Sequence, residues 1–511
     1  MPIPTVQAEV AAFLSQLAGS PPLETAGSLV FAGSDDVLKL RKAIARPIVD
    51  SRSRRWRHRQ ACYELAVIAP LASGLHHELL AVVRRSDGSL ALASEPLPPD
   101  TPALDWALRM TRVEPAEFAR SCANEDTLGG RAADLLADSL FTLHNNPMAP
   151  PQGAGGSETA QLLALATVKS ALEAGFAQPD VQAWASTALM RLEDVGQRLD
   201  ERAAAGAPVA RHGNLHLGNI CRWREDWVPV DAIPPDPATG VPDAAWDVAS
   251  LLVELHAAGL DGPANRIFSR YLARTGDGGL IALLPFFMGV RGLLRAADLA
   301  VADPAGASLR ARFSAACFNR EQSVVVALGG VPGVGKTTLG RRLAVDLGSM
   351  PGALLIRWDD VRKRLLGLSP EAPSHGAGQD AAAAARIRDE LAALVRSAAL
   401  AGRSVVVEAL FLDPADRLAI SKAAADAGAA FAGLWLDAPL PLITERLASR
   451  AYDASESTVE SLRAANQIDP GIFDWQRLDA TDGDGVLREA QAALAPYRRR
   501  PARGARAPDR V

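Results

Sequence analysis

The sequence is poor in cysteine, in aromatic residues and in long apolar runs. Its 511 residues include only 4 cysteines, and aromatic side chains make up 5% of the chain. The cysteines lie far apart with no C-x-x-C pair, which argues against a zinc site or a disulfide framework and favours a reducing compartment. No apolar run approaches the roughly 18 residues of a transmembrane helix, and the first residues lack the pattern of a secretory signal. These absences predict a soluble, cytoplasmic protein without membrane contact.

The sequence also lacks an excess of basic residues. Its formal net charge is −5, so nothing in the overall balance attracts nucleic acid. Hydrophobic residues make up 48% and charged residues 22%, as in an ordinary globular protein. A chain of this length exceeds one hydrophobic core, and we expect two or three domains.

The most informative segment that is present is Gly329–Thr338, GGVPGVGKTT, directly after the apolar run Ser323–Leu328. It fits the pattern G-x-x-x-x-G-K-[ST], in which glycines let backbone N–H groups surround phosphate oxygens. The lysine of this pattern reaches the β and γ phosphates, and the hydroxyl after it holds Mg²⁺. The segment therefore predicts a site for ATP and Mg²⁺. The expected nucleotide-binding residues are Gly330, Val331, Pro332, Gly333, Val334, Gly335, Lys336, Thr337 and Thr338.

The chain after Ser323 alternates short β-rich runs with helical patterns, which predicts a parallel sheet with helices on both faces. The expected strands are Val324–Leu328, Ala353–Arg357, Ser404–Glu408 and Phe431–Leu436. The expected helices are Lys336–Leu347, Asp359–Leu366, Asp380–Ala401, Pro414–Ala427 and Leu440–Ser449. The basic, Pro/Gly-rich residues 498–511 predict a disordered tail.

Asp359 is the candidate for the acceptor side of this domain. It follows a predicted strand and opens a predicted helix, so it belongs at the carboxyl edge of the sheet, where ligands bind in open α/β folds. There it would orient or deprotonate an acceptor hydroxyl. The alternative is a helix N-cap, a position that aspartate also favours.

Three further residues are expected near the phosphates. Glu408 ends a predicted strand and would hold a Mg²⁺-bound water. Arg446 and Arg450 lie on one helix face and would neutralise charge on the transferred phosphoryl group. The alternative for these arginines is surface pairing with Glu445 or Asp437.

The residues before the phosphate-loop domain fall into two parts. Short β-like runs occupy residues 20–113, and mostly helical patterns occupy 114–315, with a seam predicted at Asp303–Asn319. The basic stretch Arg52–Arg59 would be a nucleic-acid patch or, in better agreement with the net charge, a solvated helix face.

The segment Arg211–Ile220, RHGNLHLGNI, followed by Val230 and Asp231, resembles the catalytic loop of aminoglycoside phosphotransferase-like kinases, H-G-D-x-x-x-x-N. Other stretches extend the resemblance over nearly the whole chain. They are DVLKLRKAI, ACYELAV, DWALRM, WDVASLLVEL and VRGLLRA. Together they resemble a bacterial family in which such a domain is fused to a C-terminal P-loop domain, described as ATP-binding proteins or AAA-family ATPases.

This resemblance implies that Lys39 contacts the α and β phosphates with Glu64 as its ion-pair partner, and that Asn219 and Asp231 hold Mg²⁺. The family pattern has aspartate where this chain has Asn214, and a carboxamide is no base at neutral pH. Phosphoryl transfer by this domain is therefore in doubt. The nearby His212 and His216 suggest structural histidines rather than a metal pair, because no third ligand is in sight.

The sequence thus predicts an α+β, protein-kinase-like (aminoglycoside phosphotransferase-like) domain over residues 1–318 and an α/β P-loop NTPase domain over 319–497. The predicted activity is transfer of the ATP γ-phosphate to a hydroxyl of a small molecule by the second domain. The alternatives are a nucleotide-driven ATPase switch without a phosphorylated product, and a polynucleotide end kinase, which the acidic balance disfavours.

Overall fold

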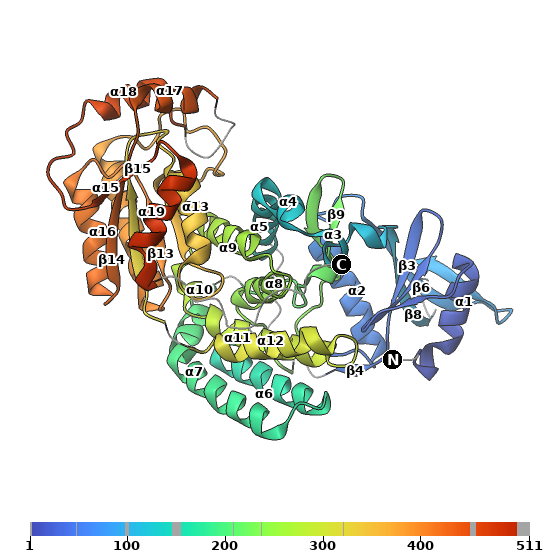
Figure 1. The fold of residues 1–511 in the computed structure, drawn as a ribbon. Coiled ribbons are helices and arrows are strands. Elements are labelled where there is room, and N and C mark those ends of the chain that lie inside the picture. Colours follow the sequence, from blue (N-terminus) through green and yellow to red (C-terminus); the bar gives the residue numbers. More distant parts are fainter. Residues whose placement is uncertain are drawn as a thin grey trace, which may run out of the picture. The chain divides into compact units, whose positions relative to one another are not determined.

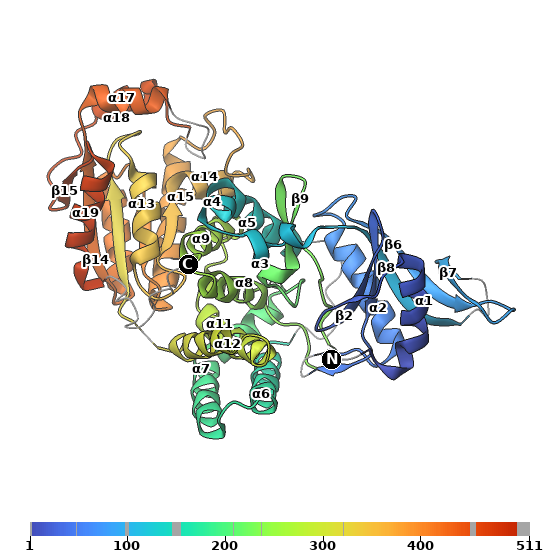
Figure 2. The same ribbon diagram turned by 45° about the vertical axis from the view of Figure 1, so that its right-hand side comes forward.

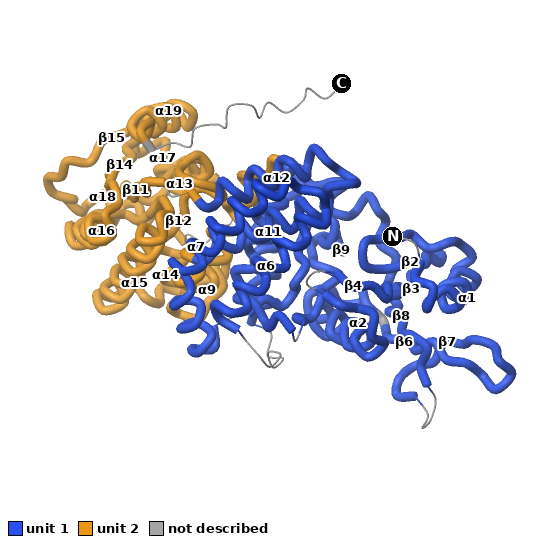
Figure 3. The backbone as a smooth tube through the Cα atoms, turned by 90° about the horizontal axis from the view of Figure 1, so that it is seen from below, with its two compact units in different colours: residues 1–258, 283–318 blue, residues 259–282, 319–511 orange. Residues whose placement is uncertain are grey.

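The computed structural model describes residues 3–46, 49–97, 102–145, 155–207, 209–236, 238–319, 321–449 and 456–497. The chain folds into two compact units, which Figure 3 distinguishes by colour. The first unit contains Met1–Ala258 and Leu283–Phe318, and the second contains Gly259–Ala282 and Asn319–Val511. The chain therefore passes between the units at three points rather than one. The predicted tail, residues 498–511, lies outside the described residues.

The first unit contains a 6-stranded sheet in the order β1-β2-β3-β8-β6-β7, with every neighbouring pair antiparallel. Its strands are β1 (Leu23–Glu24), β2 (Ser28–Ala32), β3 (Asp36–Arg41), β6 (His76–Arg84), β7 (Leu90–Ser94) and β8 (Ala103–Thr111). Two further pairs are β4 (Ala45–Arg46) with β5 (Val49–Asp50), and β9 (Ile220–Trp223) with β10 (Asp226–Pro229).

Alternation along β3 gives this sheet two different faces. Leu38 and Leu40 belong to a buried apolar cluster that includes Val10 and Leu14 of helix α1 (Ala8–Ala18). Because successive side chains of a strand point to opposite faces, Lys39 projects away from this cluster. It projects towards helix α2 (Arg54–Ile68), which carries its ion-pair partner.

The rest of the first unit is helical. Its longer helices are α5 (Gly130–His144), α6 (Ser157–Glu173), α7 (Gln178–Ala204), α8 (Ala245–Ala257), α11 (Leu284–Leu299) and α12 (Pro304–Ala316). The short helices are α3 (Ala119–Cys122) and α4 (Glu125–Leu128). In Figure 2, α6 and α7 lie side by side, as do α11 and α12. A small antiparallel sheet followed by a larger helical part is the protein-kinase-like fold that the sequence predicts.

The second unit contains a 5-stranded sheet in the order β12-β13-β11-β14-β15, parallel throughout. Its strands are β11 (Val324–Gly329), β12 (Leu354–Arg357), β13 (Val405–Glu408), β14 (Ala430–Asp437) and β15 (Gln476–Asp479). Its helices include α13 (Lys336–Asp346), α14 (Trp358–Leu365), α15 (Ala381–Leu400), α16 (Pro414–Asp426), α17 (Leu440–Ala448), α18 (Val459–Asn466) and α19 (Gly483–Ala493). Figure 1 shows α15 and α16 on one side of the sheet and α13 and α19 on the other. The predicted α/β fold with a parallel sheet is confirmed.

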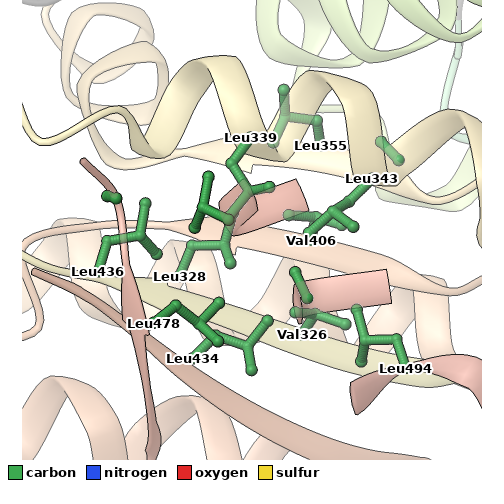
Figure 4. Close-up of a cluster of buried hydrophobic side chains, with 14 of the residues drawn as sticks. Val326, Leu328, Leu339, Leu343, Leu355, Val406, Leu434, Leu436, Leu478 and Leu494 are labelled. Carbon is green, nitrogen blue, oxygen red and sulfur yellow. The ribbon is translucent and has the colours of Figure 1, made fainter. Parts of the chain in front are cut away.

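The apolar core on the α13 side of this sheet holds the helix that follows the phosphate loop. Leu339 and Leu343 of α13 pack with Val326, Leu328 and residues of the neighbouring strands, as Figure 4 shows. Every residue of β11 is buried, as expected for a central strand covered on both faces. The phosphate loop therefore joins two rigid, buried elements.

Helices α9 (Asp261–Thr275) and α10 (Gly278–Ile281) belong to the second unit, although the sequence analysis placed their residues in the first domain. Asn265 donates hydrogen bonds to the carbonyls of Pro351 (3.0 Å) and Ala353 (2.8 Å). The Leu355 N–H donates to the Ser269 hydroxyl at 3.1 Å. Strand β12 is at the edge of the sheet, and α9 supplies hydrogen-bond partners for its Leu355 N–H and for carbonyls of the residues just before it. None of the described helices has the length and apolar character that a membrane span requires.

We predict that Asn265→Ala destabilises the second unit. The substitution leaves buried carbonyls without their donor, so the free energy of unfolding falls by about 1–3 kcal/mol. Urea unfolding of the full chain measures the change. The transition that belongs to the second unit is the one that MgATP shifts. The matched control is Asn466→Ala, at an exposed position of α18. Equal stability of the two variants would mean that α9 adds nothing to the second unit.

Candidate functional site

The phosphate loop has the backbone conformation that its glycines allow. Gly330 and Gly333 have φ angles of +138° and +81°, a region that side chains with a Cβ rarely adopt. A Cβ on Gly330 would lie 2.7 Å from the Leu436 carbonyl oxygen. A Cβ on Gly333 would lie 2.6 Å from the Leu447 side chain, near the end of α17. Both positions therefore require glycine, and the loop is held closely between its neighbours.

The loop presents donors that fit an anion. Among the described residues, the backbone N–H groups of Gly333 and Gly335 have no hydrogen-bond partner. The Lys336 ammonium donates to the carbonyls of Gly330 (2.8 Å) and Val331 (2.9 Å). Helix α13 begins at Lys336, so the positive end of its dipole lies at the same place. These groups fit the phosphates of a nucleoside triphosphate.

Three side chains meet where the central strands end. The Thr337 hydroxyl donates to Glu408 Oε1 at 2.6 Å. Arg357, at the end of β12, donates from Nε to Glu408 Oε2 at 3.3 Å, and its Nη2 lies 3.4 Å from the Thr337 hydroxyl. A hydroxyl and a carboxylate are oxygen ligands that suit Mg²⁺. The sequence analysis did not assign a role to Arg357. The available signal was its place as the last residue of a buried strand, because such a residue lies at the edge of the sheet where ligands bind.

A cavity of about 1080 Å³ extends from the phosphate loop. Its lining includes most of the loop residues predicted from the sequence, from Pro332 to Thr338, together with Asp359, Glu408 and Arg446. The structure therefore brings the predicted phosphate and acceptor residues of this unit into one cavity. Its volume slightly exceeds the range of about 300–1,000 Å³ typical of small-molecule sites.

Asp359 lies in the first turn of α14, whose N-cap position is Arg357 and has no side-chain cap bond. The N-cap alternative for Asp359 is thus not what the structure contains. Its carboxylate faces the buried Arg362 at 3.4 Å, and Arg362 lies 3.7 Å from Glu456. Glu456 in turn accepts a hydrogen bond from the Ser374 hydroxyl at 2.6 Å. A chain of charged groups therefore fixes the acceptor end of the cavity.

Arg446 makes neither of the surface ion pairs that the sequence left open. It donates to the carbonyls of Ala480 (2.8 Å) and Thr481 (2.9 Å), and a third contact of 3.4 Å reaches the Val334 carbonyl in the phosphate loop. Its guanidinium therefore lies beside the phosphate loop. Arg450 lies outside the described residues.

The first unit contains a second cluster of charges. Lys39 pairs with Glu64 at 2.7 Å, as the family resemblance implies, and also with Asp231. Arg41, two residues along β3, reaches the same carboxylates, Glu64 at 2.8 Å and Asp231 at 2.5 Å. Burial would raise the pKa of Glu64, but the charges of Lys39 and Arg41 outweigh it and hold the pKa well below its ordinary value. The closed cluster leaves Asp231 bound to two protein cations.

Both predicted metal ligands of this unit already have protein partners. The Asn219 amide donates to the Asn214 carbonyl at 3.0 Å, while Asp231 is held by the cations of β3. His212 is fully buried, and its Nε2 lies 2.8 Å from the Val230 carbonyl; burial lowers its pKa. His216 caps the next turn through the Gly218 N–H. Both histidines have structural partners, in agreement with the sequence interpretation.

Residues 325–468 match a family model described as an AAA domain. The chain is also similar to the uncharacterized protein Rv2004c of Mycobacterium tuberculosis, at 29% identity over 244 residues, covering 44% of this chain and 47% of that protein. The uncharacterized protein Mb2027c of Mycobacterium bovis matches at the same 29% identity and the same coverage. The chain thus spans about half the length of the curated relatives it matches.

The chain is also similar to solved structures, some over more than half of its length and others over about a third of it. A choline/ethanolamine kinase family protein from Mesorhizobium loti covers 62% of this chain and 95% of its own, at 16% identity and a TM-score of 0.38. A sugar kinase from Janibacter sp. covers 34% of this chain and 95% of its own, at 20% identity and a TM-score of 0.28. The APS kinase CysC of Mycobacterium tuberculosis covers 34% and 96%, at 20% identity and a TM-score of 0.24.

The topology of the second unit, its phosphate loop and the AAA-domain match identify it as a P-loop domain of the kinase or ATPase type. The first unit has a kinase-like fold, with asparagine in place of the catalytic aspartate. The chemistry of the chain is therefore expected at the phosphate loop.

We predict that ATP turnover by the full chain depends on Lys336 and not on Asp231. Lys336→Ala removes the side-chain cation of the phosphate loop, and the turnover rate falls by about 10²-fold or more. Adding Asp231→Ala to this variant gives no further loss. Lys422→Ala, an exposed lysine of α16, is the control and keeps full turnover.

The measurement is release of phosphate from ATP at saturating nucleotide. Residual turnover in Lys336→Ala that disappears with Asp231→Ala would locate an active kinase site in the first unit. Asn214→Asp, placed in the Lys336→Ala chain, tests whether the missing carboxylate alone silences that unit, because it restores a base with little change in side-chain volume.

Proposed function

We propose that the second unit transfers the γ-phosphate of ATP to a hydroxyl group of a small molecule. The observation that carries the proposal is the common cavity that both the phosphate loop and Asp359 line. A hydrolase needs only a water beside the phosphates. A carboxylate that is 30% exposed, held by an arginine and turned into a large cavity, suits an organic acceptor.

The nucleotide-binding residues would be the loop backbone and Lys336, and the Mg²⁺ ligands would be Thr337 directly and Glu408 through water. When bound, Mg²⁺ would neutralise the charge that develops on the phosphate oxygens. Arg357 already neutralises Glu408, so the metal would share that carboxylate with a protein cation. The hydroxyl, carboxylate and cationic groups of these residues are of the types that bind a magnesium–nucleotide complex.

Asp359 would accept a hydrogen bond from the acceptor hydroxyl and take its proton as the oxygen bonds to phosphorus. Arg362 orients the Asp359 carboxylate, because its guanidinium is mostly buried and lies 3.4 Å from it. Lys336 and Arg446 would balance the negative charge of the phosphoryl oxygens on the other side. The result would be ADP and a phosphate monoester of the acceptor.

We predict that Asp359→Asn suppresses phosphoryl transfer by about 10²–10⁴-fold, the usual contribution of a positioned base. ATP affinity stays near that of the wild type, because Asp359 lies at the acceptor end of the cavity. Single-turnover transfer from labelled ATP, alongside an ATP-binding titration, separates the two effects. Asp426→Asn, an exposed carboxylate of α16, is the matched control.

If Asp359→Asn changes neither ATP hydrolysis nor product formation, the acceptor role of Asp359 is wrong. A nucleotide-driven switch without a phosphorylated product would then explain the phosphate loop better. Product formation on the ends of polynucleotides alone would favour an end kinase.

A further inference from the structure

A second cavity lies wholly within the first unit, beside Asn214. Its volume is about 80 Å³, which is enough for a small ion but well below the size typical of sites for drug-like ligands. Its lining includes the side chains of Arg41, Arg46, Arg291 and Asn214, and the ring of Trp246. The proposed activity of the second unit does not use this cavity.

Arg291 is the unusual group in this lining. It lies in the buried helix α11, is only 4% exposed, and its guanidinium stacks on the Trp246 ring at 4.6 Å. No hydrogen bond or ion pair joins this guanidinium to another described residue, and its Nε is buried without a partner. Burial lowers the pKa of Arg291 to about 10, so the group is still charged at neutral pH. A buried cation without an ion-pair or hydrogen-bond partner is costly.

The acidic groups near Arg291 are all engaged elsewhere. Asp298 pairs with Arg46 at 2.6 Å. Glu254 pairs with Arg310 at 2.8 Å and with Arg295 at 3.4 Å.

Asp247 accepts backbone N–H groups at the start of the catalytic-loop segment, among them those of His212 and Gly213. Asp236, which also lines the cavity, accepts from the Ala238 N–H. Each carboxylate that faces this region therefore has its own partner, and the charge of Arg291 is left for a ligand.

Asn214 makes the same cavity compatible with a negative ligand. An aspartate at this position would repel an anion, whereas a carboxamide donates hydrogen bonds through its NH₂ group. The Asn214 backbone N–H lies 3.3 Å from the His212 ring, and its carbonyl accepts from Asn219, so both backbone groups are already paired. The side chain is free to serve the cavity.

We propose that the first unit binds a small anion, the phosphate or carboxylate group of a metabolite, between Arg291 and Asn214. Arg291 supplies the charge and two N–H donors, and Asn214 supplies a further donor. The first unit is then a receptor for an anionic molecule rather than a second catalyst. This proposal is independent of the acceptor chemistry at Asp359.

The experiment is a calorimetric titration of the full chain carrying Lys336→Ala, which weakens anion binding at the phosphate loop. Inorganic phosphate and acetate are titrated separately, and the anion that binds defines the class of ligand. Arg291→Met in this chain should weaken binding by about tenfold or more, because charge-assisted hydrogen bonds are lost. Arg312→Gln, which removes an exposed arginine of α12, should bind as the parent does.

Thermal unfolding supplies a second readout that a merely structural arginine would not give. Without anion, Arg291→Met should melt at or above the temperature of its parent, because an unpaired buried charge is removed. The parent should gain stability when the anion is added, and the variant should not. Arg291→Lys, which keeps the charge, should retain part of the gain.

Equal anion binding by the Arg291→Met chain and its parent would overturn the proposal, as would the absence of binding by either anion at millimolar concentration. If Arg291→Met fails to fold, crystals of the wild-type chain soaked in phosphate decide the matter. An anion within hydrogen-bond distance of the Arg291 guanidinium supports the site. Phosphate at the phosphate loop with none at Arg291 contradicts it.

Discussion

The parallel register of the three neighbouring strands β11, β13 and β12 determines the rest of the candidate site. Leu328 of β11 pairs with Glu408 of β13, and Glu408 pairs with Arg357 of β12. Because parallel strands end at one edge, this register places the phosphate loop, the Glu408 carboxylate and the Arg357 guanidinium side by side. A shift of one residue would turn Glu408 and Arg357 to the opposite faces of the sheet. The buried Val/Leu/Ile strands that hold the register are thus as necessary to the site as the polar residues.

The edge of this sheet explains the unusual path of the chain. Strand β12 has only one neighbour, and an open edge exposes backbone groups that attract other strands. Helix α9 satisfies part of that edge through Asn265 and Ser269. The residues next to the acceptor end of the cavity are therefore stabilised by a segment that the chain contributes well before the phosphate loop. Cutting the chain at residue 319 would remove that support.

Much of the fold follows from hydrophobic patterning. The buried strands β11 and β13 and the helices from α13 to α17 were predicted within a few residues, because their apolar residues have clear periods, whereas α18 and α19 were missed. Strand β15 was missed because only one of its four residues is buried. The helical patterns predicted over residues 114–315 did not separate α11 from α12, although Asp303 and Pro304 are an N-cap and first-turn signal. The position of α9 could not be predicted, because its polar partners include a backbone carbonyl 88 residues away in sequence.

The site was predictable to the extent that it depends on a motif. The phosphate loop, Asp359 and Glu408 follow from their place after buried strands, whereas Arg357, Arg41 and Arg291 matter because of groups that only the fold brings near.

The central claim is that the P-loop unit phosphorylates a small molecule. The most direct measurement is the mass of products after a metabolite extract is incubated with MgATP and either the wild-type chain or Lys336→Ala. The account predicts a product heavier by one phosphoryl group with the wild type alone, and ATP hydrolysis without any such product would contradict it.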